Sequence, residues 1–339
     1  MNKRWILLIT LVVTLAILAT PVVGAQRLIV THEMSPDPAE PTHAFFVVLK
    51  SYIERNSDFQ VEIFPANVLG GMRETVEQTR EGVIHIAQLS IGGCSLFWRP
   101  MLLFNTPYAY ASDKAAAAFW NSGHPFMEHM YEEFENRAGV KPLTMIERGG
   151  FTILTNNVRP VRTPEDMRGI QFRAMDSSQI ALYRALGGDG IPVPWEEVYT
   201  ALQTGVVQGQ TNPISITLDA RFDEVQKYAT MPGAIAGSGL VVANPDWYYS
   251  LSDADRRVID EAVYYARITA AGATQMSQAT GVEDLAKRGF EVTVQTPEEY
   301  EVFRTRGLEG VLDWARNEFG AELTDWFVEA VREVEAELE

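Results

Sequence analysis

The feature that most constrains the fold is an alternation of strand-like and helical runs. Leu28-Ile29-Val30 predicts a short strand, Phe45–Ile53 has the apolar spacing of a helix, and Gln60–Pro65 alternates as a strand. The order of helix and then strand recurs at Arg73–Glu81 and Ile84–Leu89. Strands that alternate with helices are typical of an α/β fold.

The second half of the chain adds long helices. Gly149-Gly150 interrupts the pattern, and a new strand is expected at Phe151–Leu154. Ser252, with Asp255 three residues later, is a capping signal for a long helix that runs toward Leu285. A second helical region follows Pro297, and we expect Gly320 to divide it.

Residues 192–213 form one compact unit. Pro192 and Pro194 hold the entry extended, Trp195 precedes a helical pattern, and Gly205 has the place of a C-cap. Asn212 stands before a proline, which biases it away from helix. The unit would deliver an aromatic ring and an amide to a pocket wall; an ordinary αβ unit with a core tryptophan fits the spacing equally well.

The order of residues in this unit is more specific. Trp195–Gly205 and Gly209–Pro213 closely resemble the signature of the DctP-type solute receptors, the extracytoplasmic binding proteins of tripartite ATP-independent periplasmic (TRAP) transporters. The resemblance continues through Phe222–Tyr228 and upstream through Thr163–Arg173. It returns at Phe64-Pro65 with Leu69-Gly70-Gly71, and so spans most of the chain in the family's order.

This resemblance implies a periplasmic-binding-protein-like α/β fold: two α/β domains around a cleft, with a long bridging helix. We expect crossings between the domains near Gly149 and near Gly237–Leu240. The first domain would comprise residues 26–149 and 239–277, and the second would comprise 150–238 and 278–339.

The N-terminus has the pattern of a cleaved secretory signal. Met-Asn-Lys-Arg precedes an apolar run from Trp5 to about Ile17, and Val23-Gly24-Ala25 is an A-x-A-like end. We therefore expect residues 1–25 to be removed and the mature protein to be periplasmic. No later segment approaches the ~20 apolar residues of a membrane helix, so no stable membrane insertion is expected.

The composition excludes some partners. The formal charge is −17, and it becomes −19 without Lys3 and Arg4. This opposes nucleic-acid binding, which depends on basic patches that neutralise phosphates. The single Cys94 excludes an internal disulfide, and we expect it to be a buried apolar residue.

Three residues are the leading binding candidates. Arg173 ends a predicted strand, and a guanidinium offers a planar fork of donors that fits a carboxylate. On spacing alone a surface ion pair is the more common role of such an arginine. The resemblance implies instead that Arg173 binds the ligand's carboxylate, Asn212 is the pocket asparagine, and Trp195 packs against the ligand.

The resemblance implies further positions less firmly. Glu33 and Ser90 follow predicted strands where family members vary residues that contact the ligand's far end, and Asp176 would face the cleft. Many members carry a second arginine where this chain has Thr152, with Arg148 four residues earlier. Either Arg148 substitutes for that arginine, or the second ionic contact is absent.

Acidic pocket residues make a fully anionic dicarboxylate a less favourable ligand, since like charges repel when desolvated. They favour a sugar acid, a hydroxy acid or a zwitterion of the ectoine or amino-acid type.

Enzyme motifs are absent from the sequence: it contains no H-E-x-x-H, no G-x-S-x-G and no P-loop. Nothing in it requires a metal, nucleotide or other cofactor. We predict a monomeric solute receptor that closes around a small organic acid and delivers it to the small and large TRAP membrane subunits. A ligand-binding module for a chemoreceptor or sensor kinase is the alternative, and an exported lyase or hydrolase on the same scaffold is a third possibility.

Overall fold

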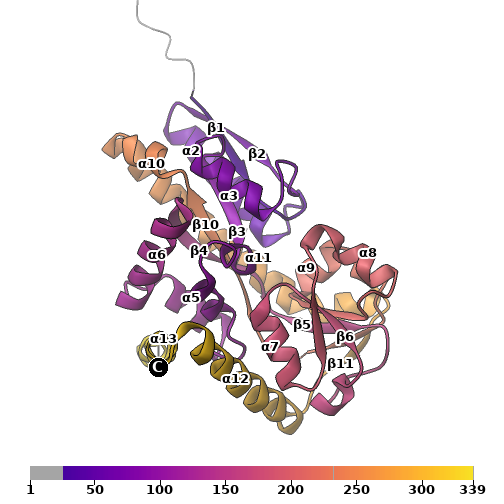
Figure 1. Ribbon diagram of the computed structural model, residues 1–339. Coiled ribbons are helices and arrows are strands. Elements are labelled where there is room, and N and C mark those ends of the chain that lie inside the picture. The colour runs from indigo at the N-terminus through magenta and orange to yellow at the C-terminus, as the bar shows by residue number, and fades with distance from the viewer. Residues whose placement is uncertain (1–25, 232, 339) are drawn as a thin grey trace, which may run out of the picture.

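The computed structural model describes residues 26–231 and 233–338, and its chain forms two mixed sheets flanked by helices (Figure 1). The α/β class predicted from the alternation is confirmed. The predicted signal segment, residues 1–25, lies outside the described residues.

The first sheet has the order β2-β1-β3-β10-β4. Its strands are β1 (Gln26–Thr31), β2 (Phe59–Phe64), β3 (Ile86–Ser90), β4 (Lys141–Phe151) and β10 (Ala236–Ala243). β1 pairs in parallel with β2 and β3, whereas β10 runs antiparallel to β3 and β4. The flanking helices are α2 (Pro41–Asn56), α3 (Met72–Arg80), α4 (Ile91–Cys94), α5 (Asp113–Trp120), α6 (Pro125–Ala138) and the 3₁₀ turn η1 (Arg99–Asn105).

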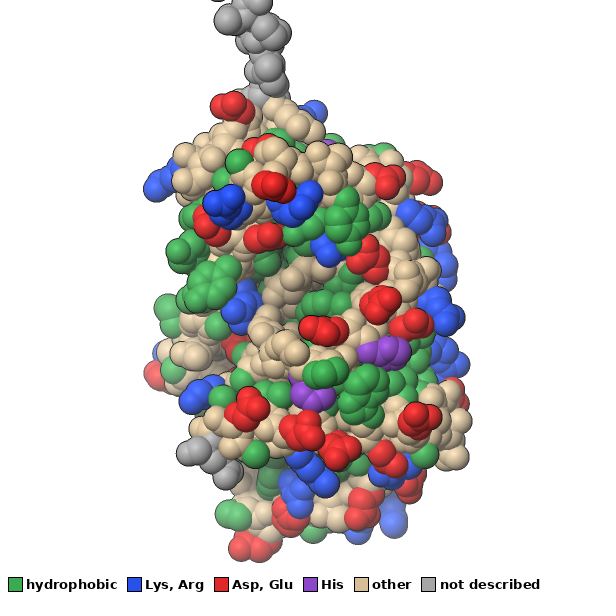
Figure 2. Space-filling view, turned by 90° about the vertical axis from the view of Figure 1, so that its left-hand side faces the viewer, with side chains coloured by type: hydrophobic (Ala, Val, Ile, Leu, Met, Phe, Trp, Pro, Cys, Tyr) green, Lys and Arg blue, Asp and Glu red, His purple; other side chains and the backbone are tan. Residues whose placement is uncertain are grey.

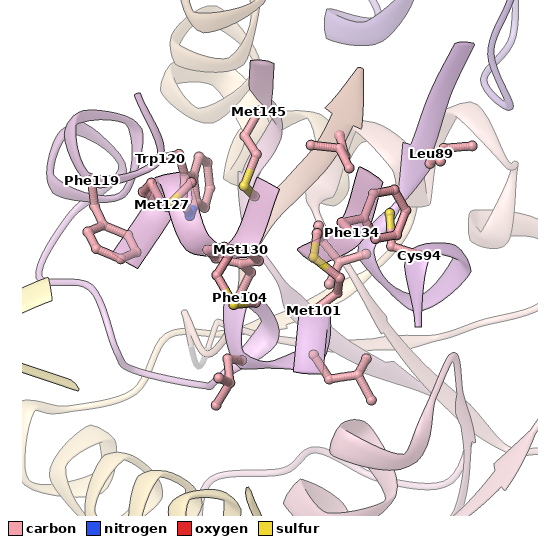
Figure 3. Close-up of a cluster of buried hydrophobic side chains, with 14 of the residues drawn as sticks. Leu89, Cys94, Met101, Phe104, Phe119, Trp120, Met127, Met130, Phe134 and Met145 are labelled. Carbon is pink, nitrogen blue, oxygen red and sulfur yellow. The ribbon is translucent and has the colours of Figure 1, made fainter. Parts of the chain in front are cut away.

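Separate hydrophobic cores cover the two faces of this sheet. One lies under α2 and includes Phe45, Phe46 and Ile146. The other lies under α5 and α6 and is rich in aromatic and methionine side chains (Figure 3). Cys94 is fully buried in this second core, as the sequence predicted, and burial raises the pKa of its thiol.

The second sheet has the order β11-β9-β5-β8-β6-β7. Its strands are β5 (Ile153–Asn156), β6 (Gln171–Ala174), β7 (Asp189–Pro192), β8 (Gly209–Asn212), β9 (Tyr228–Thr230) and β11 (Glu291–Thr293). Its helices and turns are η2 (Pro164–Met167), α7 (Ser177–Ala185), η3 (Trp195–Glu197), α8 (Val198–Gln203), α9 (Ile214–Asp219) and η4 (Phe222–Glu224).

Two segments carry the chain between the sheets, and both lie a few residues from the predicted crossings. β4 continues through Gly149 and Gly150, which have φ values of +82° and +81°, and the chain leaves the first sheet at Thr152. The glycines therefore distort the strand without ending it. The return crossing lies between Thr230 and Ala236, because Gly237–Leu240 already belongs to β10.

One long helix spans both sheets. α11 (Asp253–Lys287) packs against α2 and β4 at one end and against α9 and β11 at the other. Ser252 caps it by accepting a hydrogen bond from the backbone N–H of Asp255, as predicted. The helix α10 (Pro245–Ser250) precedes it.

The C-terminal region is divided at Gly320 into α12 (Pro297–Phe319) and α13 (Ala321–Ala336), which confirms the predicted break. α12 packs on α7, beside the second sheet, whereas α13 packs on α5 and α6 (Figure 1). Phe327 and Val331 of α13 belong to the first sheet's aromatic core. The proposed division of the chain into domains stays a prediction.

Acidic and basic side chains are interspersed over the face shown in Figure 2, with hydrophobic patches between them. Within residues 26–231 and 233–338, no helix combines the length and the apolar character that a bilayer span requires.

Candidate functional site

A cavity of about 530 Å³ lies where strand ends of the two sheets approach each other. The first sheet contributes Glu33 and Met34, just after β1, with Ser90 at the end of β3 and Arg148 on β4. The second sheet contributes the predicted residues Arg173, Trp195 and Asn212. The structure thus brings six of the eight predicted site residues into one cavity lining.

Arg173 is a buried cation whose guanidinium is largely free. Its Nε donates a hydrogen bond to the carbonyl of Val193 at 3.0 Å, and the hydroxyl of Tyr183 fixes its backbone by donating to the Arg173 carbonyl. Among the described residues, this arginine makes no ion pair. Burial lowers the pKa of Arg173, yet a guanidinium stays charged at any physiological pH. A fork of donors is left for an anion.

Arg148, unlike Arg173, is part of a buried ion pair. Its Nη2 lies 2.6 Å from Oε1 of Glu33, and both side chains are less than a tenth exposed. The same nitrogen lies 3.2 Å from the sulfur of Met34. Removing one partner of such a buried pair strongly destabilises the folded protein, because the other charge is left without a counter-ion. Glu33 therefore presents a fixed carboxylate to the cavity, neutralised from behind.

Trp195, Asn212 and Ser90 contribute shape and polar contacts. Trp195 lies in η3 and packs edge-on against Phe222 at 5.9 Å between ring centroids, which holds the half-buried indole in the wall. Asn212 donates from Nδ2 to Oε1 of Gln210 at 2.6 Å, an arrangement that orients its amide. Ser90 accepts from the backbone N–H of Gly93.

Thr152 and Asp176 lie outside the cavity lining. Thr152 is at the crossing, where its hydroxyl accepts a hydrogen bond from the N–H of Ile235. Asp176 is the N-cap of α7 and accepts from the backbone N–H groups of Ser178 and Gln179. Neither side chain is part of the cavity lining, although the Asp176 carboxylate lies close to the lining residue Gly92.

The sequence analysis missed a group of lining residues. Three methionine side chains reach the cavity from both sheets, together with a pair of charged residues at the start of α3 and a glutamate beside Trp195. They are Met34, Met72, Met175, Arg73, Glu74 and Glu196. The glycine pair at Gly70-Gly71 marked the α3 position, but nothing in the local pattern indicated which side chains face inward.

Hydrogen bonds join the two walls around the cavity. Asn67, beyond β2, donates to Oε1 of Glu196 at 2.8 Å. The backbone N–H of Ser35 donates to the carboxylate of Asp219 on α9 at 3.4 Å, and the Ser35 hydroxyl bonds the same group. The cavity is therefore bridged at its rim by polar contacts that water can replace.

The charges of the lining balance. Three arginines and three glutamates line the cavity. Arg148 and Glu33 form a pair, whereas Arg173 lies on the opposite wall and its charge is not neutralised by any ion pair among the described residues. The site therefore places a buried carboxylate that is paired with Arg148 on one wall, and a guanidinium fork without an ion pair among the described residues on the other.

Comparisons with known proteins match most of this chain to one family. The family model for bacterial extracellular solute-binding protein, family 7 (DctP) matches residues 32–316. The ectoine/5-hydroxyectoine-binding periplasmic protein UehA of Ruegeria pomeroyi is 30% identical over 263 residues, 77% of each chain. A solved ectoine-binding protein of the Halomonas elongata TeaABC TRAP transporter has a TM-score of 0.82 at 25% identity and covers 91% of this chain and 99% of its own.

A second solved structure, a TRAP periplasmic solute-binding protein from Bordetella bronchiseptica, has a TM-score of 0.81 at 29% identity. It covers 90% of this chain and 99% of its own, so the two-sheet architecture matches over nearly its whole length. The family comprises binding proteins that deliver small solutes to membrane subunits for transport, and not enzymes. The comparisons give no support to a chemoreceptor module. This chain therefore belongs to the DctP family, and it is a solute-binding protein of the TRAP transporter type.

Proposed function

We propose that this protein binds a compact zwitterion, a solute with one carboxylate and one cationic group. The observation that carries the proposal is the separation of charge in the cavity. Arg173 offers an unpaired guanidinium fork on one wall, and the Glu33 carboxylate faces the cavity from the other. A solute with both charges satisfies each wall without leaving a desolvated charge unpaired.

The apolar part of the lining supports a small hydrocarbon body between the two charged groups. Met34, Met175 and Trp195 line the same cavity as the charged positions. Methionine side chains adapt to an irregular ligand, and an indole face attracts a cation. A hydroxyl-rich sugar acid would leave many of its donors facing thioethers and carbon.

Two relatives point to the same class of solute. The Ruegeria and Halomonas proteins are named as ectoine-binding, and ectoine is a compact ring that carries a carboxylate and an amidinium. Ectoine is therefore the first solute to test.

The proposed transport step uses the two-sheet architecture. The two sheet bodies close around the solute because Arg173 and Glu33 contact it together only in the closed form. The mature protein, freed of residues 1–25 and periplasmic, acts as a monomer that hands the solute to the small and large TRAP membrane subunits. Its moving units are residues 26–149 with 239–277 and residues 150–238 with 278–339.

The test is thermal-shift screening followed by calorimetry. The panel contains ectoine, 5-hydroxyectoine, glycine betaine and neutral amino acids, with pantoate, galactonate and succinate as anions. A ligand that binds only the folded protein raises its melting temperature. We expect zwitterions to bind most tightly and succinate most weakly; tighter binding of succinate than of every zwitterion would contradict the proposal. Size-exclusion chromatography with light scattering checks the monomer.

A further inference from the structure

A continuous line of hydrogen bonds leads from the cavity wall into the second sheet. Nδ2 of Asn212 donates to Oε1 of Gln210 at 2.6 Å, and Nε2 of Gln210 donates to the hydroxyl of Thr155 at 2.9 Å. That hydroxyl donates in turn to Oε1 of Gln226 at 3.2 Å. These four side chains, here called the amide relay, come from β8, β5 and the segment before β9. Of the four, only Asn212 lines the cavity.

The relay is buried except at its cavity end. Thr155 and Gln210 are fully buried, Gln226 is 6% exposed, and Asn212 is half-buried. Water therefore has little access to the inner three side chains and cannot replace a lost partner there. Because an unpaired buried amide or hydroxyl is unfavourable, each inner group has to keep its donor facing an acceptor.

The inner end of the relay fixes its direction. Nε2 of Gln226 lies 3.3 Å from the carbonyl oxygen of Gln208 and 3.0 Å from that of Val225. A backbone carbonyl can only accept a hydrogen bond, so the atom of Gln226 at these two contacts has to be the nitrogen. The amide oxygen of Gln226 therefore faces Thr155.

The orientation of each later member follows from this end. The Thr155 hydroxyl has one hydrogen, which it donates to Gln226, so it can only accept from Gln210. Gln210 then has to turn its nitrogen toward Thr155 and its oxygen toward Asn212. The hydroxyl of Thr217, 3.4 Å from the same nitrogen, is compatible with this orientation. Asn212 therefore presents Nδ2 to Gln210, and Oδ1 is the amide atom that points away from Gln210.

Oδ1 of Asn212 is available to a solute. It has no hydrogen-bond partner within residues 26–231 and 233–338, and it is not one of the buried atoms there that lack one. Asn212 ends β8, and Arg173 lies on β6, which runs parallel to β8 as its neighbour in the sheet. A freely rotating amide could offer either of its two polar atoms at this point. The relay makes the point an acceptor only.

We propose that the amide relay selects solutes that carry an N–H or O–H group beside the carboxylate bound by Arg173, because that group donates to Oδ1 of Asn212. The inference rests on the function proposed above and adds a requirement to it. Thr155, Gln210 and Gln226 are positioning residues, since they act on the solute only through Asn212. Ectoine meets the requirement: a ring N–H is next to the carbon that bears its carboxylate.

Two zwitterions with the same ring and charges test the requirement. In proline betaine, methyl groups replace the N–H groups of proline, so its cationic nitrogen cannot donate a hydrogen bond. We expect the wild type to bind proline about tenfold more tightly, the order of one hydrogen bond. Thr155→Val removes the hydroxyl link with little change of shape, and this ratio should fall to about threefold or less. Thr155→Ser keeps the hydroxyl and should restore it. Calorimetry measures both affinities.

Thr230→Val is the matched control. Thr230 is 1% exposed on β9, the strand beside β5, and its hydroxyl donates to the carbonyl of Val161, outside the relay. This variant should lose stability but keep the wild-type ratio of proline to proline betaine. The size of the methyl groups is the same in every comparison, so a change in the ratio reports on the relay. An unchanged ratio in Thr155→Val, or an equal fall in Thr230→Val, would overturn the inference.

A crystal structure of the wild type with ectoine decides the question if Thr155→Val does not fold or if proline does not bind. A ring nitrogen of ectoine should lie within hydrogen-bond distance of the Asn212 amide atom that points away from Gln210. A carboxylate oxygen there, or no polar atom of ectoine, would overturn this inference and leave the zwitterion function intact.

Binding of anions alone would overturn the proposed function instead. Crystals with pantoate, whose hydroxyl is next to its carboxylate, then test the relay independently. The pantoate hydroxyl should lie at Oδ1 of Asn212; a carboxylate oxygen in its place would overturn the inference as well.

Discussion

The two walls of the cavity each carry a buried arginine, and the two are used in opposite ways. Arg173, on β6 of the second sheet, donates one hydrogen bond from Nε to a backbone carbonyl, and the other guanidinium N–H groups are free to bind an anion. Arg148, on β4 of the first sheet, is bound to Glu33 in a buried ion pair. The wall from the second sheet therefore offers the charge of Arg173 to the solute, whereas on the wall from the first sheet the charge of Arg148 is neutralised by Glu33.

This difference suggests a way in which one fold can select different solutes. A free buried cation demands an anion, because desolvating it without a partner is unfavourable. A cation that is paired within the protein needs no anion from the solute, and it instead fixes the orientation of its carboxylate partner. Selectivity would then depend on which wall keeps its charge unpaired.

The largest effect should come from removing the free cation. Arg173→Ala is expected to weaken binding by about 2–5 kcal/mol, the usual loss when one member of a buried charge pair is truncated. Arg173→Lys should recover only part of this, since an ammonium cannot form the two-pronged contact. Calorimetry decides, with exposed Arg168→Ala as the control. Near-wild-type affinity in Arg173→Ala would remove this residue from the site.

Removing the paired carboxylate should change selectivity as well as affinity. Glu33→Gln leaves Arg148 without its partner and is expected to weaken zwitterion binding by about 1–3 kcal/mol. The same change should weaken succinate binding less, because the unpaired Arg148 can then accept a second carboxylate. The ratio of the two affinities is the measurement. A ratio that matches the wild type would mean that Glu33 does not contact the cationic group.

Asp176 tests whether a site position predicted from sequence acts on the ligand or on the fold. Asp176→Ala removes the cap of α7 and the hydrogen bond from Asn105, and should lower the free energy of unfolding by about 1 kcal/mol. Chemical denaturation measures this loss. Ligand affinity should change much less than in Glu33→Gln; the reverse pattern would return Asp176 to the binding site.

The smallest effect is expected at the rim. Asn67→Ala removes the hydrogen bond to Glu196 that joins the walls, which is worth about 0.5–1.5 kcal/mol. Because that contact joins the two walls at the rim of the cavity, we expect its loss to speed ligand dissociation with little change in the association rate. Stopped-flow tryptophan fluorescence, to which Trp195 in the cavity wall contributes, would follow it. Asn56→Ala, an exposed change on α2, is the control, and an equal dissociation rate in both variants would dismiss the rim contact.

Local pattern predicted much of the fold. The strands around Leu28 and Val61, the capped start of α11 and the break at Gly320 all follow from periodicity and capping over a few residues. The first crossing lies a few residues beyond Gly149 because β4 resumes its long-range pairing with β10 at Phe151, after a register shift at the two glycines. Met72 and Met175 escaped notice because an isolated methionine looks the same in a core and in a cavity.

The sequence by itself determined the alternation of elements, the acidic charge, the family motifs and the identity of the residues that can hold a carboxylate. Tertiary structure decided how those residues are used. Arg148 and Glu33 are 115 positions apart, and their pairing depends on β10 lying between β3 and β4. Likewise, the tertiary structure places Thr152 at the crossing, where it accepts a hydrogen bond from Ile235, and makes Asp176 the N-cap of α7. Charge, hydrogen bonding and burial depend on neighbours in space, and the sheets bring together neighbours that the order of residues does not reveal.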